Sequence, residues 1–111
     1  MSGYVPERGD LVWLKYDSAG GHEQAGHRPA ITLSRRWYNE KVGLALFCPV
    51  TTRIKGYPWE VPLPDGLKTT GVVLSDHVQS MDWRARRARF IEHVPRTETS
   101  VVLANAAKLL M

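Results

Sequence analysis

The chain consists of short apolar runs that glycine, proline and other turn-forming residues repeatedly interrupt. The first run, residues 11–16, holds side chains that favour strands and precedes a turn-type cluster. Similar runs occupy residues 30–33, 43–50 and 71–75. Because none is long enough for a helix of ordinary length, each predicts a strand. The pattern therefore constrains the chain to a mainly β structure without long helices.

Further strands follow from alternation and from the position of one proline. Residues 59–61 alternate as a half-buried strand should, and residues 76–94 indicate a strand, a break and another strand. Pro49 cannot donate a hydrogen bond to a neighbouring strand, so we expect an edge or a bulge there. The strands together predict a small, strongly bent antiparallel barrel.

Two segments have helical features. Ser34 could cap one or two helical turns that run through Glu40 and stop at Gly43. Thr97 could begin a terminal helix whose apolar side chains recur at the spacing of one buried face. These side chains are Val102, Ala106, Leu109 and Leu110. We expect this face to pack in the core or in a dimer contact.

Length and composition bound the class of protein. The 111 residues fit one domain, which we assign to residues 1–111. No apolar run approaches the roughly 18 to 20 residues of a membrane span, and residues 1–10 do not resemble a secretion signal. We therefore expect a cytoplasmic protein without membrane contact. The only cysteine, Cys48, lies in an apolar run, which excludes an intramolecular disulfide and favours a buried thiol.

The net charge of +4 is unevenly distributed. Five arginines fall between Arg84 and Arg96. Such a stripe attracts polyanions through counterion release, although a solvated strand face would carry the same charges.

The densest polar cluster of the first half occupies residues 22–29, close to three glycines. A zinc site would use His22 and His27, but this spacing matches no recognised ligand pattern, and we expect no metal. The alternatives are an inert polar loop and an anion-handling site. In the latter, Arg28 grips a phosphate while Glu23 or a histidine moves protons.

Two other polar groups stand at the ends of predicted strands. Thr51 and Thr52 supply hydroxyl groups, and Ser75, Asp76 and His77 add a carboxylate and an imidazole. The sequence has neither the Gly-x-Ser-x-Gly elbow of a serine hydrolase nor a Walker loop. The set suits cleavage of RNA through its own 2′-hydroxyl group, for which the protein supplies position, charge and proton transfer. This chemistry requires no cofactor.

Three tryptophans stand near basic residues in the sequence and could stack on single-stranded bases. They are Trp37, Trp59 and Trp83. Trp13 and Phe47 instead lie inside apolar strands, and we expect both in the core.

The order of these motifs resembles the MazF/PemK family of toxin ribonucleases. The family's opening Gly-Asp-(aliphatic)-(aliphatic)-Trp, its Glu-Gln-x-Gly-x-Arg-Pro signature and its Pro-x-Thr-(Thr/Ser) site all have counterparts, and two further motifs follow. They lie at residues 9–13, 23–29, 49–52, 55–58 and 71–77. The resemblance extends over about residues 4–86 and joins several motifs in register.

The resemblance implies an SH3-like antiparallel barrel of the CcdB/PemK type that works as a homodimer. It implies a sequence-specific, metal-independent endoribonuclease toxin of a type II toxin-antitoxin module. Such a toxin cuts single-stranded RNA, mRNA included, leaves 2′,3′-cyclic phosphate and 5′-hydroxyl ends, and inhibits translation and growth. The implied partner is a cognate antitoxin with an acidic disordered C-terminal tail that covers the RNA groove. Operator DNA would be reached only through that antitoxin.

Residue roles carry over by position. Arg28 and Thr51 match the catalytic arginine and threonine, and Glu23 matches a loop acid required for activity. Because a guanidinium does not readily lose its proton, we favour Glu23 or His27 as the base. We also expect catalytic or substrate-binding roles for His27, Thr52, Ser75, Asp76 and His77. The expected RNA contacts are Lys55, Tyr57, Trp59, Gln79, Arg84 and Arg86.

Two rival classes stay open at this level. One is an SH3-like module that binds nucleic acid without cutting it. The other is a CcdB-like gyrase poison, a family that acts through a C-terminal Trp-Gly-Ile tail, whereas this sequence ends in Leu109, Leu110 and Met111.

Overall fold

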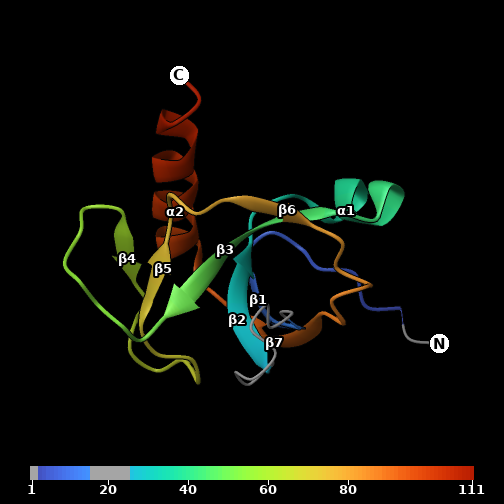
Figure 1. Cartoon of the computed structure of the whole chain (residues 1–111), viewed down its shortest axis with the longest axis horizontal. Helices are drawn as coiled ribbons and strands as arrows, with labels where there is room; N and C mark the ends of the chain where they lie inside the picture. The colour runs from blue at the N-terminus through green and yellow to red at the C-terminus, as the bar shows by residue number, and fades with distance from the viewer. Residues whose placement is uncertain (1–2, 16–25) are drawn as a thin grey trace.

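The computed structural model describes residues 3–15 and 26–111. Within them the chain forms short strands and two helices in an order that confirms the mainly β prediction (Figure 1). The elements are β1 (Asp10–Lys15), β2 (His27–Thr32), α1 (Arg36–Val42), β3 (Ala45–Thr51), β4 (Glu60–Pro62), β5 (Val72–Leu74), β6 (Gln79–Met81), β7 (Arg89–His93) and α2 (Arg96–Lys108).

The strands form one antiparallel sheet in the order β4-β5-β3-β2-β1-β7, and β6 also pairs with β3. Among the described residues no pairing joins β7 to β4, so the predicted barrel is a bent sheet that strand pairing leaves open. Side-chain contacts link these two ends of the sheet instead. The Glu92 carboxylate of β7 accepts hydrogen bonds from the backbone amides of Lys68 and Thr69 at 2.9 and 2.8 Å, and these lie between β4 and β5.

Strand β3 changes partner along its length, and Pro49 stands where it does so. On one side, Ala45 to Phe47 pair with β6, and Val50 and Thr51 pair with β5. In the described structure, Cys48 and Pro49 have no strand partner on that side. Since proline has no N–H group, the gap leaves no backbone donor of Pro49 without a partner. The predicted local edge at Pro49 is therefore confirmed.

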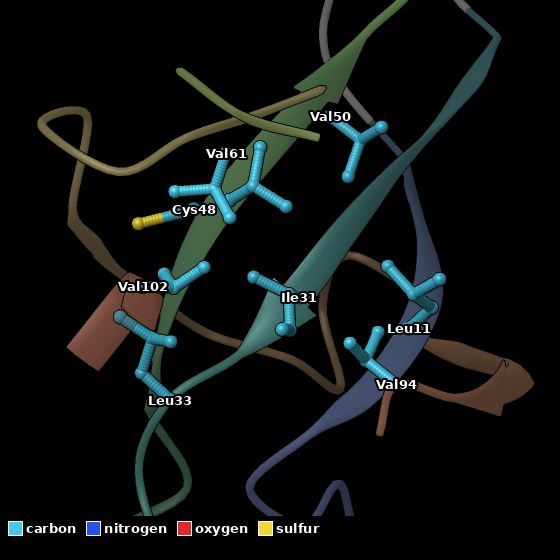
Figure 2. Close-up of a cluster of buried hydrophobic side chains, with 9 residues drawn as sticks. Leu11, Ile31, Leu33, Cys48, Val50, Val61, Val94 and Val102 are labelled. Carbon is cyan, nitrogen blue, oxygen red and sulfur yellow. The ribbon is translucent and has the colours of Figure 1, made fainter. Parts of the chain in front are cut away.

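One hydrophobic core lies between the sheet and α2. It is formed by Leu11, Ile31, Leu33, Cys48, Val50, Val61, Val73, Val94 and Val102. Figure 2 shows Val102 of α2 near Leu33 and Cys48, with Leu11 and Val94 at the other end of the cluster. Cys48 is fully buried as predicted, and this burial raises the pKa of its thiol to about 12.

A second core covers the other face of the sheet and includes Phe47 and Trp83. Trp83 is buried, and its indole Nε1 donates to the Asn39 carbonyl oxygen at 3.0 Å. The expected stacking role for this residue is therefore wrong. Trp13 was expected in the core but is 36% exposed, because its neighbours Val12 and Leu14 take the buried positions of β1.

The two helices occupy the predicted segments, but their N-terminal caps differ from the prediction. Helix α1 begins after Arg35, and Ser34 does not cap it. The Ser34 hydroxyl donates to the Asn39 side-chain oxygen at 2.5 Å and accepts from the Leu46 amide. Gly43 ends α1 with a φ of 83°, as predicted.

Helix α2 begins at Arg96 after Pro95, without a side-chain cap from Thr97. It packs against β4, and α1 lies away from it in Figure 1. Val102 is buried as expected, but Leu109 and Leu110 are 49% and 89% exposed. Neither helix in the described residues is long and apolar enough to cross a membrane.

Candidate functional site

A cleft opens where β3 has no partner on one side. It has a volume of about 520 Å³, and its walls come from β2, β3, β5, β6 and the turn between β5 and β6. The lining residues are Arg28, Pro49, Val50, Thr51, Leu74, Asp76, His77, Val78 and Gln79. The gap in the ladder thus creates a concave polar surface over the middle of the sheet.

Arg28 and Thr51 approach this cleft from neighbouring strands. The ladder pairs Ala30 of β2 with Pro49 of β3, and continuing it by two residues sets Arg28 opposite Thr51. Since side chains alternate along a strand, both point to the same face as Ala30 and Pro49. On its other side Arg28 pairs with Leu14 of β1. Arg28 therefore lies in a strand that has a neighbour on each side. The sequence placed it in a loop, and this prediction is wrong because β2 already begins at His27.

Local contacts fix the end of β3. The Thr51 hydroxyl accepts a hydrogen bond from the Arg53 amide at 3.0 Å, so its own hydrogen can be donated to a ligand. Gly71, with a φ of +118°, lies so close to this strand end that an added Cβ would overlap the Thr51 carbonyl oxygen. A glycine there allows β5 to reach β3, a role that the sequence alone did not reveal.

Ser75 has a structural position. It is fully buried, and its hydroxyl donates to the Trp59 carbonyl oxygen at 2.5 Å and accepts from the Asn105 side chain at 3.1 Å. These bonds hold the β5–β6 turn against the start of β4 and against α2. The structure does not place Ser75 in the cleft, contrary to its expected substrate contact.

The next two residues of this turn do line the cleft. The side chains of Asp76 and His77 are 27% and 50% exposed. His77 Nε2 lies 3.7 Å from Asp76 Oδ1, and this buried oxygen accepts no hydrogen bond within the described residues. A carboxylate and an imidazole therefore line the same cleft as the arginine and the threonine.

A smaller hollow of about 140 Å³ adjoins the cleft and shares Thr51, Leu74 and His77 with it. Its other walls are Arg53, Lys55, Tyr57 and Glu60. The Glu60 carboxylate accepts from the amides of Lys55 and Gly56 at 3.0 and 2.8 Å, which holds this segment in place. Lys55 and Tyr57 thus line a hollow that adjoins the cleft, and their RNA contacts stay a prediction. The sequence analysis did not identify Arg53 as a site residue. Its position directly after Thr51 and Thr52 could have indicated it.

Several predicted residues are not brought into the cleft. Arg84 stacks over the Trp83 ring at 4.5 Å, and Arg86 Nη1 donates to the Lys15 carbonyl oxygen at 3.2 Å. Both belong to the segment that covers the second core, and neither lines the cleft or the hollow. Arg84 and Arg86 therefore lie outside the cleft and the hollow.

Other predicted contacts lie at its margin or outside the described residues. Trp59 is half-buried and lines neither the cleft nor the hollow, and its carbonyl oxygen receives the Ser75 hydroxyl outside both. Thr52 is exposed beyond the cleft lining, and strand alternation turns His27 away from the face that Arg28 occupies. Glu23 and His22 lie outside the described residues. In the described part of the chain, no three histidine, cysteine or acidic side chains gather as a metal site.

A family model for the PemK-like, MazF-like toxins of type II toxin-antitoxin systems matches residues 7–110. The chain belongs to this family. The fold class and the motif resemblance are thereby confirmed, and the cleft has the predicted arginine and threonine on a scaffold of this family.

Relatives agree along most of the chain. The endoribonuclease toxin MazF of Escherichia coli (strain K12) is 53% identical over 88 residues, which cover 79% of this chain and 78% of that protein. The Escherichia coli endoribonuclease PemK is 34% identical over 110 residues, covering 94% and 81%. A crystal structure of MazE-MazF from Deinococcus radiodurans matches with a TM-score of 0.92 and 49% identity, covering 97% of each chain.

Proposed function

We infer that the chain is an endoribonuclease toxin that cuts single-stranded RNA in the cleft between Arg28 and Thr51. Family membership and relatives named as endoribonucleases support this function. The observation that carries the assignment of the site is that Arg28 and Thr51 line one cleft from the adjacent antiparallel strands β2 and β3.

The proposed reaction uses the 2′-hydroxyl group of the substrate as the nucleophile. The 2′-oxygen attacks the adjacent phosphorus and loses its proton to a base. The bond from phosphorus to the 5′-oxygen breaks, and that oxygen takes up a proton. The products are a 2′,3′-cyclic phosphate and a 5′-hydroxyl end. Arg28 and the Thr51 hydroxyl hold the non-bridging oxygens as their negative charge grows, which is where fixed donors accelerate such a step most.

Proton transfer is assigned to groups on the cleft side. Glu23 remains the proposed base by family resemblance. His77 lines the cleft beside Thr51, whereas His27 points to the other face of β2, so we assign the second proton-transfer role to His77. Asp76 stands next to His77 and can orient its ring.

The RNA chain is proposed to continue from the cleft into the adjoining hollow. Arg53 and Lys55 supply positive charge there, and Tyr57 is 43% exposed and offers a ring on which a base can stack. Gln79 at the opposite wall has amide groups that can bond to a base edge.

The assembly is proposed to be a homodimer formed across an apolar groove. This groove, of about 700 Å³, lies between α1, β3, the β5–β6 turn and the end of α2, and Trp37 and Leu110 on its walls are 69% and 89% exposed. Asp76 and Val78 line both this groove and the cleft, so a second copy would border the active site. We further propose that the chain is a single domain that acts in the cytoplasm. An antitoxin with an acidic tail would inhibit it, because a similar MazF crystallised with MazE.

A mixed pool of RNA tests the activity. The purified chain is incubated with the pool and excess chelator, and the ends of the fragments are mapped. Cleavage at a short recurring sequence with cyclic phosphate ends is expected. RNA binding without new ends would favour the non-cutting module, and gyrase inhibition without RNA cleavage would favour the gyrase poison.

A further inference from the structure

A second polar cavity lies at the other end of the sheet from the cleft. It has a volume of about 480 Å³ and is bordered by the start of β1, the end of β7 and the start of α2. Arg28 pairs with Leu14, whereas this cavity adjoins Gly9, five residues earlier, so the two sites stand about 16 Å apart along the chain of β1. The residues that matter here are Arg8, Arg35, His93, Arg96 and Ser100, which we call the basic corner. Arg8 and Arg35 also line the edge of the apolar groove proposed for the dimer.

The imidazole of His93 is held in one orientation at this corner. Its Nδ1 lies 2.9 Å from Asp10 Oδ1, and Asp10 is only 5% exposed. The other Asp10 oxygen accepts from the Tyr4 hydroxyl at 2.8 Å and the Glu7 amide at 3.1 Å. With Nδ1 bonded to this buried carboxylate, Nε2 is the ring atom left for a ligand.

Gly9 makes room for that ring. It has a φ of +93°, and an added Cβ would lie 2.8 Å from His93 Cε1. A buried carboxylate, a phenol and a glycine thus position an imidazole that has no part in the cleft. Side chains that are oriented in this way by buried partners are typical of binding sites.

Three guanidinium groups surround the same space, those of Arg8, Arg35 and Arg96. Arg8 Nε donates to the Leu33 carbonyl oxygen at 2.7 Å, which fixes its position. Burial and then the charge of Arg35 lower the pKa of Arg8, so the two cations are close enough to repel each other. No carboxylate of the described residues lies within ion-pair distance of Arg8, Arg35 or Arg96.

One nearby acid offsets part of this charge, since Glu7 interacts electrostatically with Arg8 and Arg35 without forming an ion pair with either. Glu7 also lines the cavity, but its Oε1 accepts from the amides of Arg8 and Arg36, both at 2.9 Å. The Asp10 carboxylate is occupied by Tyr4, the Glu7 amide and His93. The cavity therefore presents guanidinium groups and the Ser100 hydroxyl, which can donate to one anion, and an imidazole whose Nε2 donates as well when the ring is protonated.

We propose that the basic corner is a phosphate-binding site separate from the cleavage cleft. A phosphate group offers several oxygens in a tetrahedral arrangement and can receive forked bonds from arginine together with single bonds from histidine and serine. The group can come from free phosphate or from the backbone of an RNA chain. This site does not depend on the proposed cleavage reaction.

Calorimetric titration with inorganic phosphate at constant pH and ionic strength tests the site. Arg35→Gln and Arg96→Gln each remove one charge from the corner. Arg89→Gln removes the same charge from an exposed position on β7 that does not line the corner and serves as the matched control. Each of the first two variants should weaken phosphate binding about tenfold, and the control should leave it unchanged.

Backbone resonances give a second readout on the unmodified chain. Phosphate should shift the amide signals of Gly9 and Ser100, and the shifts should saturate with the calorimetric affinity. Equal affinity in all three variants, or shifts that do not saturate or are confined to the cleft, would mean an adventitious ion only and would overturn the proposal.

A mixed-sequence 2′-O-methyl RNA separates the two sources of phosphate, because it lacks the free 2′-hydroxyl and cannot be cut. If RNA supplies the group, Arg96→Gln should bind this RNA more weakly than Arg89→Gln, and inorganic phosphate should compete. If free phosphate is the ligand, both variants should bind the RNA equally. Either result is consistent with a phosphate site at the basic corner. The cleavage activity of the unmodified chain is tested separately with the RNA pool.

Discussion

Arg28 and Thr51 face one cleft from adjacent antiparallel strands, two residues beyond the pairing of Ala30 with Pro49. Pro49 leaves that part of β3 without a partner on its other side, and Gly71 lets β5 approach the strand end. The cleft therefore exists because of the same backbone features that fix its two principal side chains.

The guanidinium of Arg28 is expected to act through its forked geometry as well as its charge. Arg28→Lys keeps the charge but cannot form two parallel bonds to a phosphate. Cleavage under single-turnover conditions should slow by about 100-fold, the size of effect seen when one oxyanion donor is lost. Binding of 2′-O-methyl RNA should change much less. Cleavage at the original rate would show that Arg28 acts only as a point charge.

Gly71 should matter both for its φ and for the space that it leaves. Gly71→Ala places a methyl group against the Thr51 carbonyl oxygen, while Gly66→Ala has a comparable φ of +99° in open space. Backbone strain alone costs about 1–3 kcal/mol. In urea unfolding, Gly71→Ala should therefore lower the free energy of unfolding more than Gly66→Ala does. Equal losses would mean that the close approach to Thr51 relaxes at no cost.

Ser75 should be a stability residue. Ser75→Ala leaves the Trp59 carbonyl oxygen without the Ser75 hydroxyl and removes the acceptor of the Asn105 amide group. Loss of such buried bonds costs about 1–3 kcal/mol. The melting temperature should fall, while the cleavage rate well below it stays close to that of the unmodified chain. A large loss of cleavage in the fully folded variant would show that Ser75 takes part in the reaction.

The buried Cys48 thiol should contribute to the alkaline limit of stability. Burial raises its folded pKa from 9.0 to about 12. The folded chain thus retains a proton that the unfolded chain loses above its own pKa, so this contribution is present below pH 9 and is lost as pH rises through the folded pKa. Unfolding measured from pH 8 to 11 should show a steeper loss of stability for the unmodified chain than for Cys48→Ala. Parallel slopes would contradict this assignment.

The sequence predicted what depends on local pattern. Strand ends at Thr51 and after Leu74, the stop at Gly43 and the buried Cys48 follow from alternation, turn residues and apolar runs. Family motifs predicted that Arg28 and Thr51 share one site. The structure shows why they do, because β2 and β3 pair as antiparallel neighbours.

What sequence reasoning missed depends on contacts between distant residues. Ser34 has the chemistry of a helix cap, but Asn39 and the Leu46 amide take its hydroxyl. Ser75 lies in a polar motif, yet Trp59 and Asn105 bury it. The arginines around Arg86 belong to a segment that covers the second core and do not line the cleft, because neighbouring Trp83 is buried in that core.

Single-turnover cleavage of a mapped RNA by Thr51→Val and Thr52→Val tests the central claim most directly. The two variants make the same change at adjacent positions, but only Thr51 lines the cleft. The Thr51 variant should be slowed by at least about 100-fold with its RNA affinity largely kept, and the Thr52 variant should cut within a few-fold of the original rate. Full activity in the Thr51 variant, or equal losses in both, would contradict a cleavage site built from Arg28 and Thr51.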